Sequence, residues 1–245
     1  MSPAADLESF FRKLERRDAL SAEERDALIA AAGPRESFAA GSDLVREGDR
    51  PDRSILVTQG FTTRYRVLAD GQRQITAIHL PGDFVDLHSF LLHTMDHSVG
   101  ALSNVRVVTF PHANLRLITE RYPHLTRLLW LTTLLDSAIH REWIVAMGRR
   151  TAAQQLAHLI CEIFSRLHLI GLAEFDQEVS LPITQIELGD TLGLSAVHVN
   201  RTLQQLRAEQ LIIWQGQSVR VLDWARLTKV AEFDSAYLHD EREPR

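Results

Sequence analysis

Three patterns of hydrophobic and polar positions follow one another along the chain. Between residues 6 and 32 apolar side chains recur at the spacing of a helix, and Ser21 opens the sequence Ser-Ala-Glu-Glu, which is typical of a helix capping box. From residue 54 to residue 110 short apolar stretches alternate with turns that contain glycine. We therefore predict short N-terminal helices followed by a small β-barrel or β-roll. The turn glycines are Gly48, Gly60, Gly71 and Gly82.

A long helix is predicted from Tyr122 to Met147, because this segment contains no glycine and its only proline, Pro123, lies near its start. Apolar residues cover two faces of this helix, so it needs two partners. We expect one face to pack on the chain's own β-roll and the other on the same helix of a second copy, in a two-fold homodimer. The alternative is a central helix buried inside a monomer. The expected dimer interface is the stripe of Leu125, Leu128, Thr132, Leu135, Ile139 and Glu142.

The C-terminal part of the chain carries the pattern of a helix-turn-helix. Thr184 with Glu187 three positions later predicts a capping box that starts a short helix, and Gly193 supplies a left-handed residue at its end. Ser195 then caps a second helix with an apolar inner face and a polar outer start. Its inner residues are Val199, Leu203 and Leu206, and its outer residues are Ala196, Val197, Asn200 and Arg201.

Two flanking features make this pattern more specific. Downstream, two short apolar strands surround Gln215-Gly216, which predicts a hairpin and hence a wing. Upstream, Gly148-Arg149-Arg150 interrupts the helical pattern and Thr151 can cap a new helix, so we expect the hinge between two domains there. Any antiparallel helix pair with a glycine turn can imitate a helix-turn-helix pattern, and the wing, hinge and long helix in this order argue against such an imitation.

Composition limits the classes of function. The chain has 245 residues, a formal net charge of −5 and no apolar run long enough for a membrane span, and its N-terminus lacks the features of a secretory signal, so we expect a soluble cytoplasmic protein. The negative charge argues against a non-specific nucleic-acid coat, so DNA binding must rest on a small local surface. The single cysteine, Cys161, excludes an intrachain disulfide and a cysteine-rich metal site made by this chain alone.

The chain resembles the Crp/Fnr superfamily of bacterial transcription regulators over nearly its whole length. The likeness rests on Val45-Arg-Glu-Gly-Asp, Gln59-Gly-Phe, Pro81-Gly-Asp-Phe-Val-Asp and the helix-turn-helix, and it is greater for the Fnr and FixK branches than for the cyclic-AMP receptor protein. It implies an α+β fold with an N-terminal β-roll similar to cyclic-nucleotide-binding domains, a long dimerisation helix and a C-terminal winged helix-turn-helix. The expected boundaries are 1–121, 122–148 and 149–245. The resemblance also implies a homodimer on an inverted-repeat operator and contact with RNA polymerase.

The resemblance assigns roles to the outer face of the second helix. Arg201 corresponds to the family's guanine-reading arginine, whose guanidinium can bind O6 and N7 together; the alternative is a phosphate contact or a solvent-exposed surface residue. Val197 stands where many relatives carry a glutamate that accepts from cytosine, so we expect a different half-site. Asn200 could read adenine. The expected DNA-binding residues are Thr184, Gln185, Ser195, Ala196, Val197, His198, Asn200, Arg201 and Gln217.

The expected effector pocket lacks a phosphate-binding arginine. Relatives that bind cyclic nucleotides carry Gly-Glu followed by Arg-Ser, whereas this chain has Gly82-Asp83 and Asp96-His97-Ser98. A neutral histidine offers neither a permanent charge nor a bidentate fork, so we expect an effector other than cyclic AMP. Ser137 lies where such relatives contact their ligand. The candidate pocket residues are therefore Gly82, Asp83, His97, Ser98 and Ser137.

We predict no cofactor, although an unidentified small-molecule effector fits this class of protein. An iron–sulfur cluster is excluded because the N-terminal cysteines of the Fnr branch are missing, and the scattered histidines disfavour haem, whose axial ligand would be His79, His88, His93 or His97. A metal-dependent β-roll enzyme is the alternative from another class. No His-x-His pair with a downstream glutamate supports it, so we expect neither a metal site nor enzyme activity. A ligand-binding module without DNA binding is disfavoured by Asn200, Arg201 and the wing.

Overall fold

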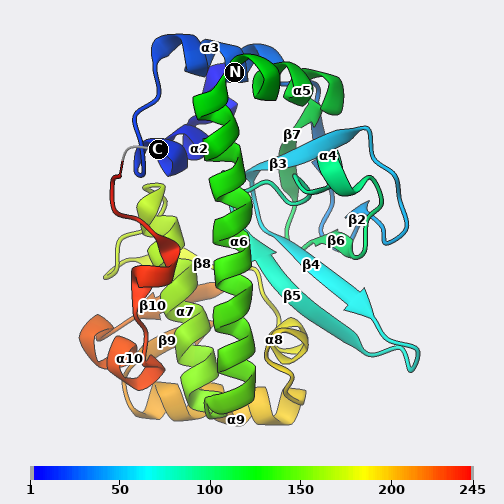
Figure 1. Ribbon diagram of the computed structural model, residues 1–245. Coiled ribbons are helices and arrows are strands. Elements are labelled where there is room, and N and C mark those ends of the chain that lie inside the picture. The colour runs from blue at the N-terminus through cyan, green and yellow to red at the C-terminus, as the bar shows by residue number, and fades with distance from the viewer. Residues whose placement is uncertain (1–2, 244–245) are drawn as a thin grey trace. The chain divides into compact units, whose positions relative to one another are not determined.

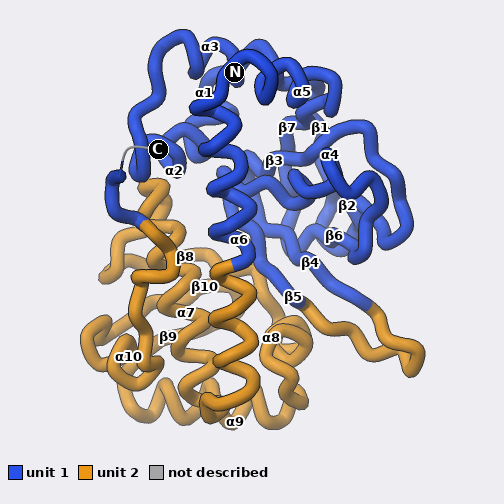
Figure 2. The backbone as a smooth tube through the Cα atoms, in the orientation of Figure 1, with its two compact units in different colours: residues 1–66, 76–137, 240–245 blue, residues 67–75, 138–239 orange. Residues whose placement is uncertain are grey.

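The computed structural model describes residues 3–243, which form two compact units (Figure 2). The first unit takes the chain up to residue 66, residues 76–137 and the chain from residue 240 onward, and the second takes residues 67–75 and 138–239. The division within the long helix therefore falls after Ser137, not at the expected hinge. None of the helices among the described residues is long and apolar enough to cross a bilayer.

The first unit begins with the predicted N-terminal helices, α1 (Pro3–Asp6), α2 (Glu8–Glu15) and α3 (Ala22–Ala31) (Figure 1). The capping box at Ser21 is confirmed, because its side chain accepts from the Glu24 N–H while the Glu24 carboxylate accepts from the Ser21 N–H. These helices bury Phe10, Phe11 and Leu28 in the core of the unit.

The predicted β-roll is confirmed. Its two antiparallel sheets have the strand orders β1-β7-β3 and β2-β6-β4-β5. Strands β3 and β7 carry the longest apolar runs, and opposed residues such as Leu56 and Val108 are buried in one core cluster. The elements are β1 (Arg35–Phe38), β2 (Asp43–Val45), β3 (Arg53–Gln59), β4 (Thr62–Val67), β5 (Arg73–His79), α4 (Ser89–Leu92), β6 (Ser98–Ala101), β7 (Val105–Pro111) and α5 (His112–Arg121).

The predicted long helix is α6 (Pro123–Arg149), which continues through Gly148 before Thr151 caps the next helix. The prediction that the leucines of the expected stripe lie at the dimer interface is wrong. Leu125 and Leu128 are fully buried in the core cluster that contains Phe110, and Leu135 is buried as well, so they serve the chain's own fold. Thr132, Ile139 and Glu142 are half-buried, and Glu142 accepts from Arg150 at 2.6 Å.

A different stripe of α6 faces solvent. Its exposed positions follow alternating steps of three and four residues, which is the heptad spacing of a helix-pairing seam. We call this stripe the outer seam; it consists of Arg127, Trp130, Leu134, Ser137, Arg141 and Ile144. Both stripes have helical spacing, so periodicity alone cannot tell which of them faces the β-roll.

The second unit is built around α7 (Ala152–Leu169), which packs against α9 and α10. Its polar centre is Glu162, a fully buried carboxylate that accepts from Trp143 Nε1, Tyr237 Oη and Arg166 Nη1 at 3.0 Å each. Cys161 is fully buried, as expected of an apolar helix face. The remaining elements are β8 (Glu178–Ser180), α8 (Gln185–Leu192), α9 (Ala196–Ala208), β9 (Ile212–Gln215), β10 (Ser218–Val221), α10 (Trp224–Ala231) and the 3-10 helix η1 (Ser235–Leu238).

Candidate nucleic-acid interface

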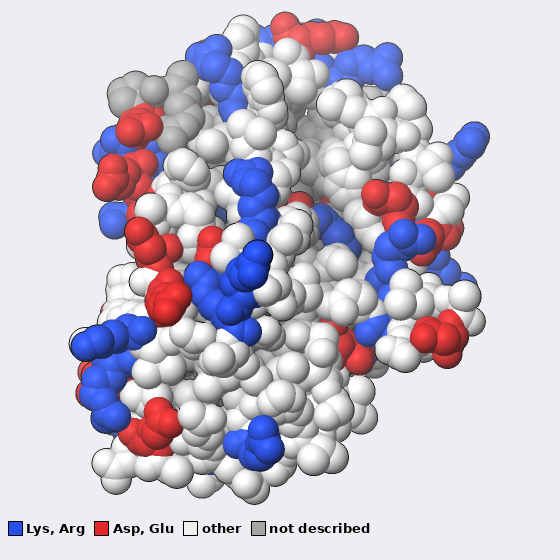
Figure 3. Space-filling model, turned by 60° about the horizontal axis from the view of Figure 1, so that its bottom comes forward, with Lys and Arg blue, Asp and Glu red and all other residues white. Residues whose placement is uncertain are grey.

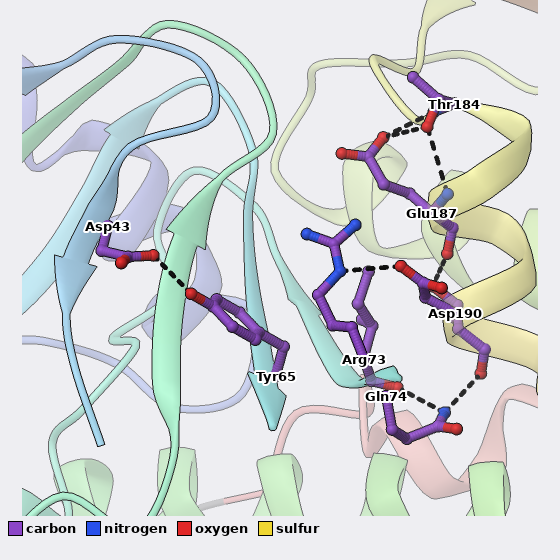
Figure 4. A network of polar contacts seen from close by, with 9 residues as sticks. Asp43, Tyr65, Arg73, Gln74, Thr184, Glu187 and Asp190 are labelled. Atoms are coloured by element: carbon purple, nitrogen blue, oxygen red, sulfur yellow. Dashed lines mark hydrogen bonds and ion pairs between the residues drawn. The ribbon is translucent and has the colours of Figure 1, made fainter. Parts of the chain in front are cut away.

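Helices α8 and α9 form the predicted helix-turn-helix. Thr184 Oγ1 accepts from the Glu187 N–H at 3.2 Å, and the Glu187 carboxylate accepts from the Thr184 N–H at 2.7 Å (Figure 4). The first helix ends at Gly193 in the left-handed conformation, and Ser195 Oγ accepts from the His198 N–H to start α9. Both caps satisfy amide groups that the helix itself leaves free, so the local sequence fixes where each helix begins.

The two helices pack closely through an apolar interior. A side chain at Gly189 would lie 2.6 Å from the Leu194 carbonyl oxygen, so only glycine allows this approach of the turn to α8. Val199, Leu203 and Leu206 are buried on the inner face of α9, as predicted. The packing therefore fixes which face of α9 points outward.

The outer face of α9 carries the predicted base-reading residues. Val197 is 81% exposed, and Ala196 and Arg201 are exposed beside it. Arg201 forms no hydrogen bond or ion pair within the described part of the chain, so its guanidinium is available to a ligand. Asn200 is half-buried, and its Nδ2 donates to Gln185 Oε1 at 3.2 Å. Asn200 therefore links the second helix to the start of the first.

The predicted wing is present as the β9–β10 hairpin, with β8 as a third strand beside β10. Gln217 is exposed in its turn, and its backbone carbonyl accepts from the Leu181 N–H at 2.7 Å. The sequence reasoning missed Arg220, which is exposed on β10 between the buried Val219 and Val221. The alternation of polar and apolar residues in this strand was the signal that could have found it.

Charge on the protein surface is mixed. Figure 3 shows Lys and Arg in small groups among acidic and uncharged side chains on the face that it presents. This agrees with the net charge of −5. The face shown in Figure 3 therefore offers only small local groups of positive charge for attraction to phosphates.

Helix α8 also has a polar contact with residues that are distant in the sequence. Arg73 Nε donates to Asp190 Oδ2 at 2.8 Å, and Gln74 Nε2 donates to the Thr191 carbonyl at 3.4 Å (Figure 4). Both sides of this contact belong to the second unit, which includes residues 67–75 although they connect two strands of the β-roll. This contact could not be predicted from local patterns, because 117 residues separate Arg73 from Asp190.

The expected effector residues each have local partners. Asp83 pairs with Lys13 and accepts from the Leu80 N–H, and the Gly82 N–H donates to the Val57 carbonyl. Ser98 accepts from the Glu47 N–H at 3.0 Å, and the exposed Ser137 donates to the Thr133 carbonyl on its own helix. The contacts described for these residues do not bring the five candidates together in one pocket.

The sequence reasoning also missed a buried cation in the β-roll. Arg64 on β4 is 7% exposed; it donates to Asp136 at 2.8 Å and to the Val85 carbonyl at 3.2 Å. Burial, together with the charges of Arg64 and His88, lowers the pKa of His97 to about 4, so the imidazole is neutral at neutral pH. The roll thus does hold a permanent positive charge, but Asp136 already neutralises it.

The chain thus combines a β-roll domain with a winged helix-turn-helix that carries an outward, unpaired arginine. This combination defines a DNA-binding regulator with a sensor domain and a DNA-binding domain. Residues 35–122 match the cyclic nucleotide-binding domain, and residues 154–230 match the Crp-like helix-turn-helix domain.

Curated relatives and solved structures agree with this class. The transcriptional activator protein FnrL of Cereibacter sphaeroides is 31% identical over 202 residues, which are 81% of each chain. The nitrogen fixation regulation protein FixK of Bradyrhizobium diazoefficiens is 29% identical over 199 residues, 81% of this chain and 82% of its own. The structure of FixK2 from Bradyrhizobium japonicum has a TM-score of 0.73 and 25% identity, and covers 81% of this chain and 96% of its own.

The chain belongs to the Crp/Fnr family. It is a DNA-binding transcription regulator, and the relatives are regulators rather than enzymes. The predictions of family, fold and general function are thereby confirmed.

Proposed function

We propose that this regulator binds an inverted-repeat DNA site as a homodimer and places α9 of each copy in the major groove. The observation that carries the proposal is Arg201, which is exposed and unpaired on the outer face of a helix whose inner face is buried. A guanidinium in that position can form a bidentate contact with guanine O6 and N7.

The residues near Arg201 determine the other proposed contacts with bases and phosphates. Val197 lies one turn earlier on the exposed face and offers only apolar contact, such as with a thymine methyl group, so it cannot select cytosine as a carboxylate would. Asn200 is bonded to Gln185 and reads adenine only if it gives up that bond. Phosphate contacts are assigned to Thr184, Gln185, His198 and Gln217, and Ser195 and Ala196 lie at the exposed start of α9.

Dimerisation is assigned to the outer seam of α6. Trp130 is 65% exposed, Leu134 50% and Ile144 65%, and such a line of large apolar side chains is the kind of surface that a second helix covers. A two-fold dimer presents two α9 helices about one turn of DNA apart, which requires a palindromic site. Contact of the bound dimer with RNA polymerase follows from the activator role that the names of FnrL and Anr state for those relatives.

The effector of this regulator is, in this proposal, a small molecule other than cyclic AMP. The support is His97, which is neutral and hydrogen-bonded to Asp96 at 2.6 Å, and Arg64, whose charge is neutralised by Asp136 at 2.8 Å. No tightly held cofactor is needed for DNA binding in this proposal.

Binding-site selection with the purified chain tests the proposal at one fixed salt concentration. We expect a palindromic consensus, and we expect Arg201→Ala to cost about 1–3 kcal/mol on that site while binding to random DNA changes little. Arg116→Ala is the control, because it removes an equal charge from an exposed position on α5 in the first unit. Equal weakening of specific and random DNA by Arg201→Ala would make Arg201 a phosphate contact, and selection of no sequence would refute the proposal.

A further inference from the structure

A cluster of metal-ligand side chains lies in the first unit, away from the helix-turn-helix in the sequence. His88 directly precedes α4, and Asp96 and His97 directly precede β6. One nitrogen or oxygen ligand atom from each of the three residues lies within 4.8 Å of the other two. The rings of His88 and His97 are 5.0 Å apart between centroids. The fold thus brings together two imidazoles and a carboxylate from the two ends of the segment that contains α4.

His97 is held in the orientation of a metal ligand. Its Nδ1 lies 2.6 Å from Asp96 Oδ1, and because a carboxylate only accepts, this bond places the imidazole proton on Nδ1. The Nε2 atom then carries a free lone pair. A carboxylate that fixes the other ring nitrogen is the usual support of a metal-binding histidine.

The free nitrogen of His97 has no partner in the protein. The side chain is 9% exposed, and Nε2 is buried without a hydrogen bond to any described residue. A buried polar atom without a partner is costly, so a ligand that accepts this lone pair would stabilise the folded roll. A metal ion is such a ligand, because it binds the lone pair directly.

The surroundings select the class of ion. Two imidazole nitrogens favour zinc and similar first-row metals over Mg²⁺ or Ca²⁺, which prefer oxygen ligands. The Asp96 side chain is 78% exposed, so the cluster is open to solvent on that side. Arg64 opposes a cation near His97, but Asp136 neutralises Arg64 at 2.8 Å and Asp96 supplies a further negative charge.

We propose that His88 and His97 bind one divalent transition-metal ion of the zinc class, His97 through its Nε2 atom. Asp96 orients His97 from the other ring nitrogen, and the remaining coordination positions are open to solvent. This site lies beyond the DNA-binding function, and it revises our expectation from the sequence that the chain has no metal site. Neither the nine-residue interval between His88 and His97 nor the single carboxylate is a recognised metal motif, so the sequence alone could not indicate it.

The test uses the untagged full-length chain after chelation and dialysis. Titration with Co²⁺ should give one ion per chain and the intense visible absorption of a four- or five-coordinate nitrogen and oxygen site, and Zn²⁺ should displace Co²⁺ while Mg²⁺ does not. We expect His88→Ala and Asp96→Asn to weaken binding at least about tenfold. His93→Asn is the matched control, because His93 is exposed, near His88 and outside the cluster.

The variants keep the proposal falsifiable even if the buried His97 cannot be replaced without unfolding. His88 is half-buried and Asp96 is exposed, so both substitutions should leave the circular dichroism spectrum unchanged. The proposal is overturned if the folded His88→Ala and Asp96→Asn chains bind Co²⁺ as tightly as the native chain. It is also overturned if His93→Asn loses as much affinity as they do.

A regulatory consequence follows, and it rests on the proposed function. If the metal is the signal, Zn²⁺ should change the affinity of the native chain for its selected operator but not that of His88→Ala. Loss of operator binding in every condition would refute the DNA proposal and leave the Co²⁺ result standing. Metal binding without any change in operator affinity would refute the signal role alone.

Discussion

Leu128 and Leu134 lie on two different faces of α6, one packed in the core of the first unit and the other proposed as the dimer interface. Leu128 is fully buried in the core cluster of the first unit, whereas Leu134 is 50% exposed on the outer seam. Leu128→Ala removes buried methyl groups and leaves a cavity, so we expect it to lower the free energy of unfolding by about 3 kcal/mol. Leu134→Ala leaves no cavity in the single chain and should change that free energy by less than about 0.5 kcal/mol.

For dimer association, Leu134→Ala should have the larger effect of the two substitutions. Complete burial of a leucine contributes about 1.5–3 kcal/mol, and half of the Leu134 side chain is still accessible to a partner, so about 1 kcal/mol per copy depends on it. A two-fold interface counts the change twice, which gives about 2 kcal/mol. We therefore expect Leu134→Ala to raise the Kd of the dimer roughly 30-fold.

Two measurements separate these effects. Sedimentation gives the dimer Kd, and urea unfolding at two protein concentrations separates chain stability from association. Leu117→Ala is the control, because Leu117 is 45% exposed on α5, outside the outer seam, and should change neither quantity. The reasoning fails if Leu134→Ala leaves the dimer Kd unchanged while Leu128→Ala weakens the dimer without loss of chain stability.

Two further predictions concern individual polar contacts. Burial opposes the charged form of His124, but bonds to Glu24 at 2.6 Å and Asp18 at 3.2 Å outweigh it and raise the pKa of His124. The contribution of His124 to the free energy of unfolding is complete below about pH 6.5 and is lost as the pH rises through the raised pKa. In urea unfolding above about pH 6.5, the free energy of unfolding should therefore fall more steeply with pH for the native chain than for His124→Gln. Parallel curves for the two chains would refute this prediction. Arg73→Ala removes the partly exposed pair with Asp190, so it should cost about 0–1 kcal/mol overall but speed amide exchange in α8. Unchanged exchange in α8 would show that the pair does not hold this helix.

The helix-turn-helix was predictable because its rules are local. The signals at Thr184 and Glu187, at Gly193 and at Ser195 each act within four residues. The capping box of α8, the turn and the N-cap of α9 could therefore be placed from the sequence, and all three are present in the structure. The β-roll was predictable for the same reason, since glycine turns and apolar stretches mark its strands.

Other features could not be predicted from the sequence, because they depend on contacts between residues that are distant in the chain. Leu128 and Leu134 have equivalent apolar spacing on α6, and only the core cluster around Phe110 decides which of them is buried. Arg64 belongs to a polar stretch of β4, yet it is buried and paired with Asp136, 72 positions away. The rings of His88 and His97 come close only because α4 and the loop after it turn the chain back to the start of β6.

The second unit is not a continuous stretch of sequence, since it takes residues 67–75 from between two strands of the roll and the end of α6 from residue 138 onward. A fragment that starts at residue 149 would omit Trp143, one of three donors to the buried Glu162, and Arg73, the partner of Asp190 on α8. Such a fragment is therefore shorter than the compact unit to which the recognition helices belong. A chimera that keeps the whole unit has to carry the β4–β5 turn and the end of α6 from the same parent as the recognition helices.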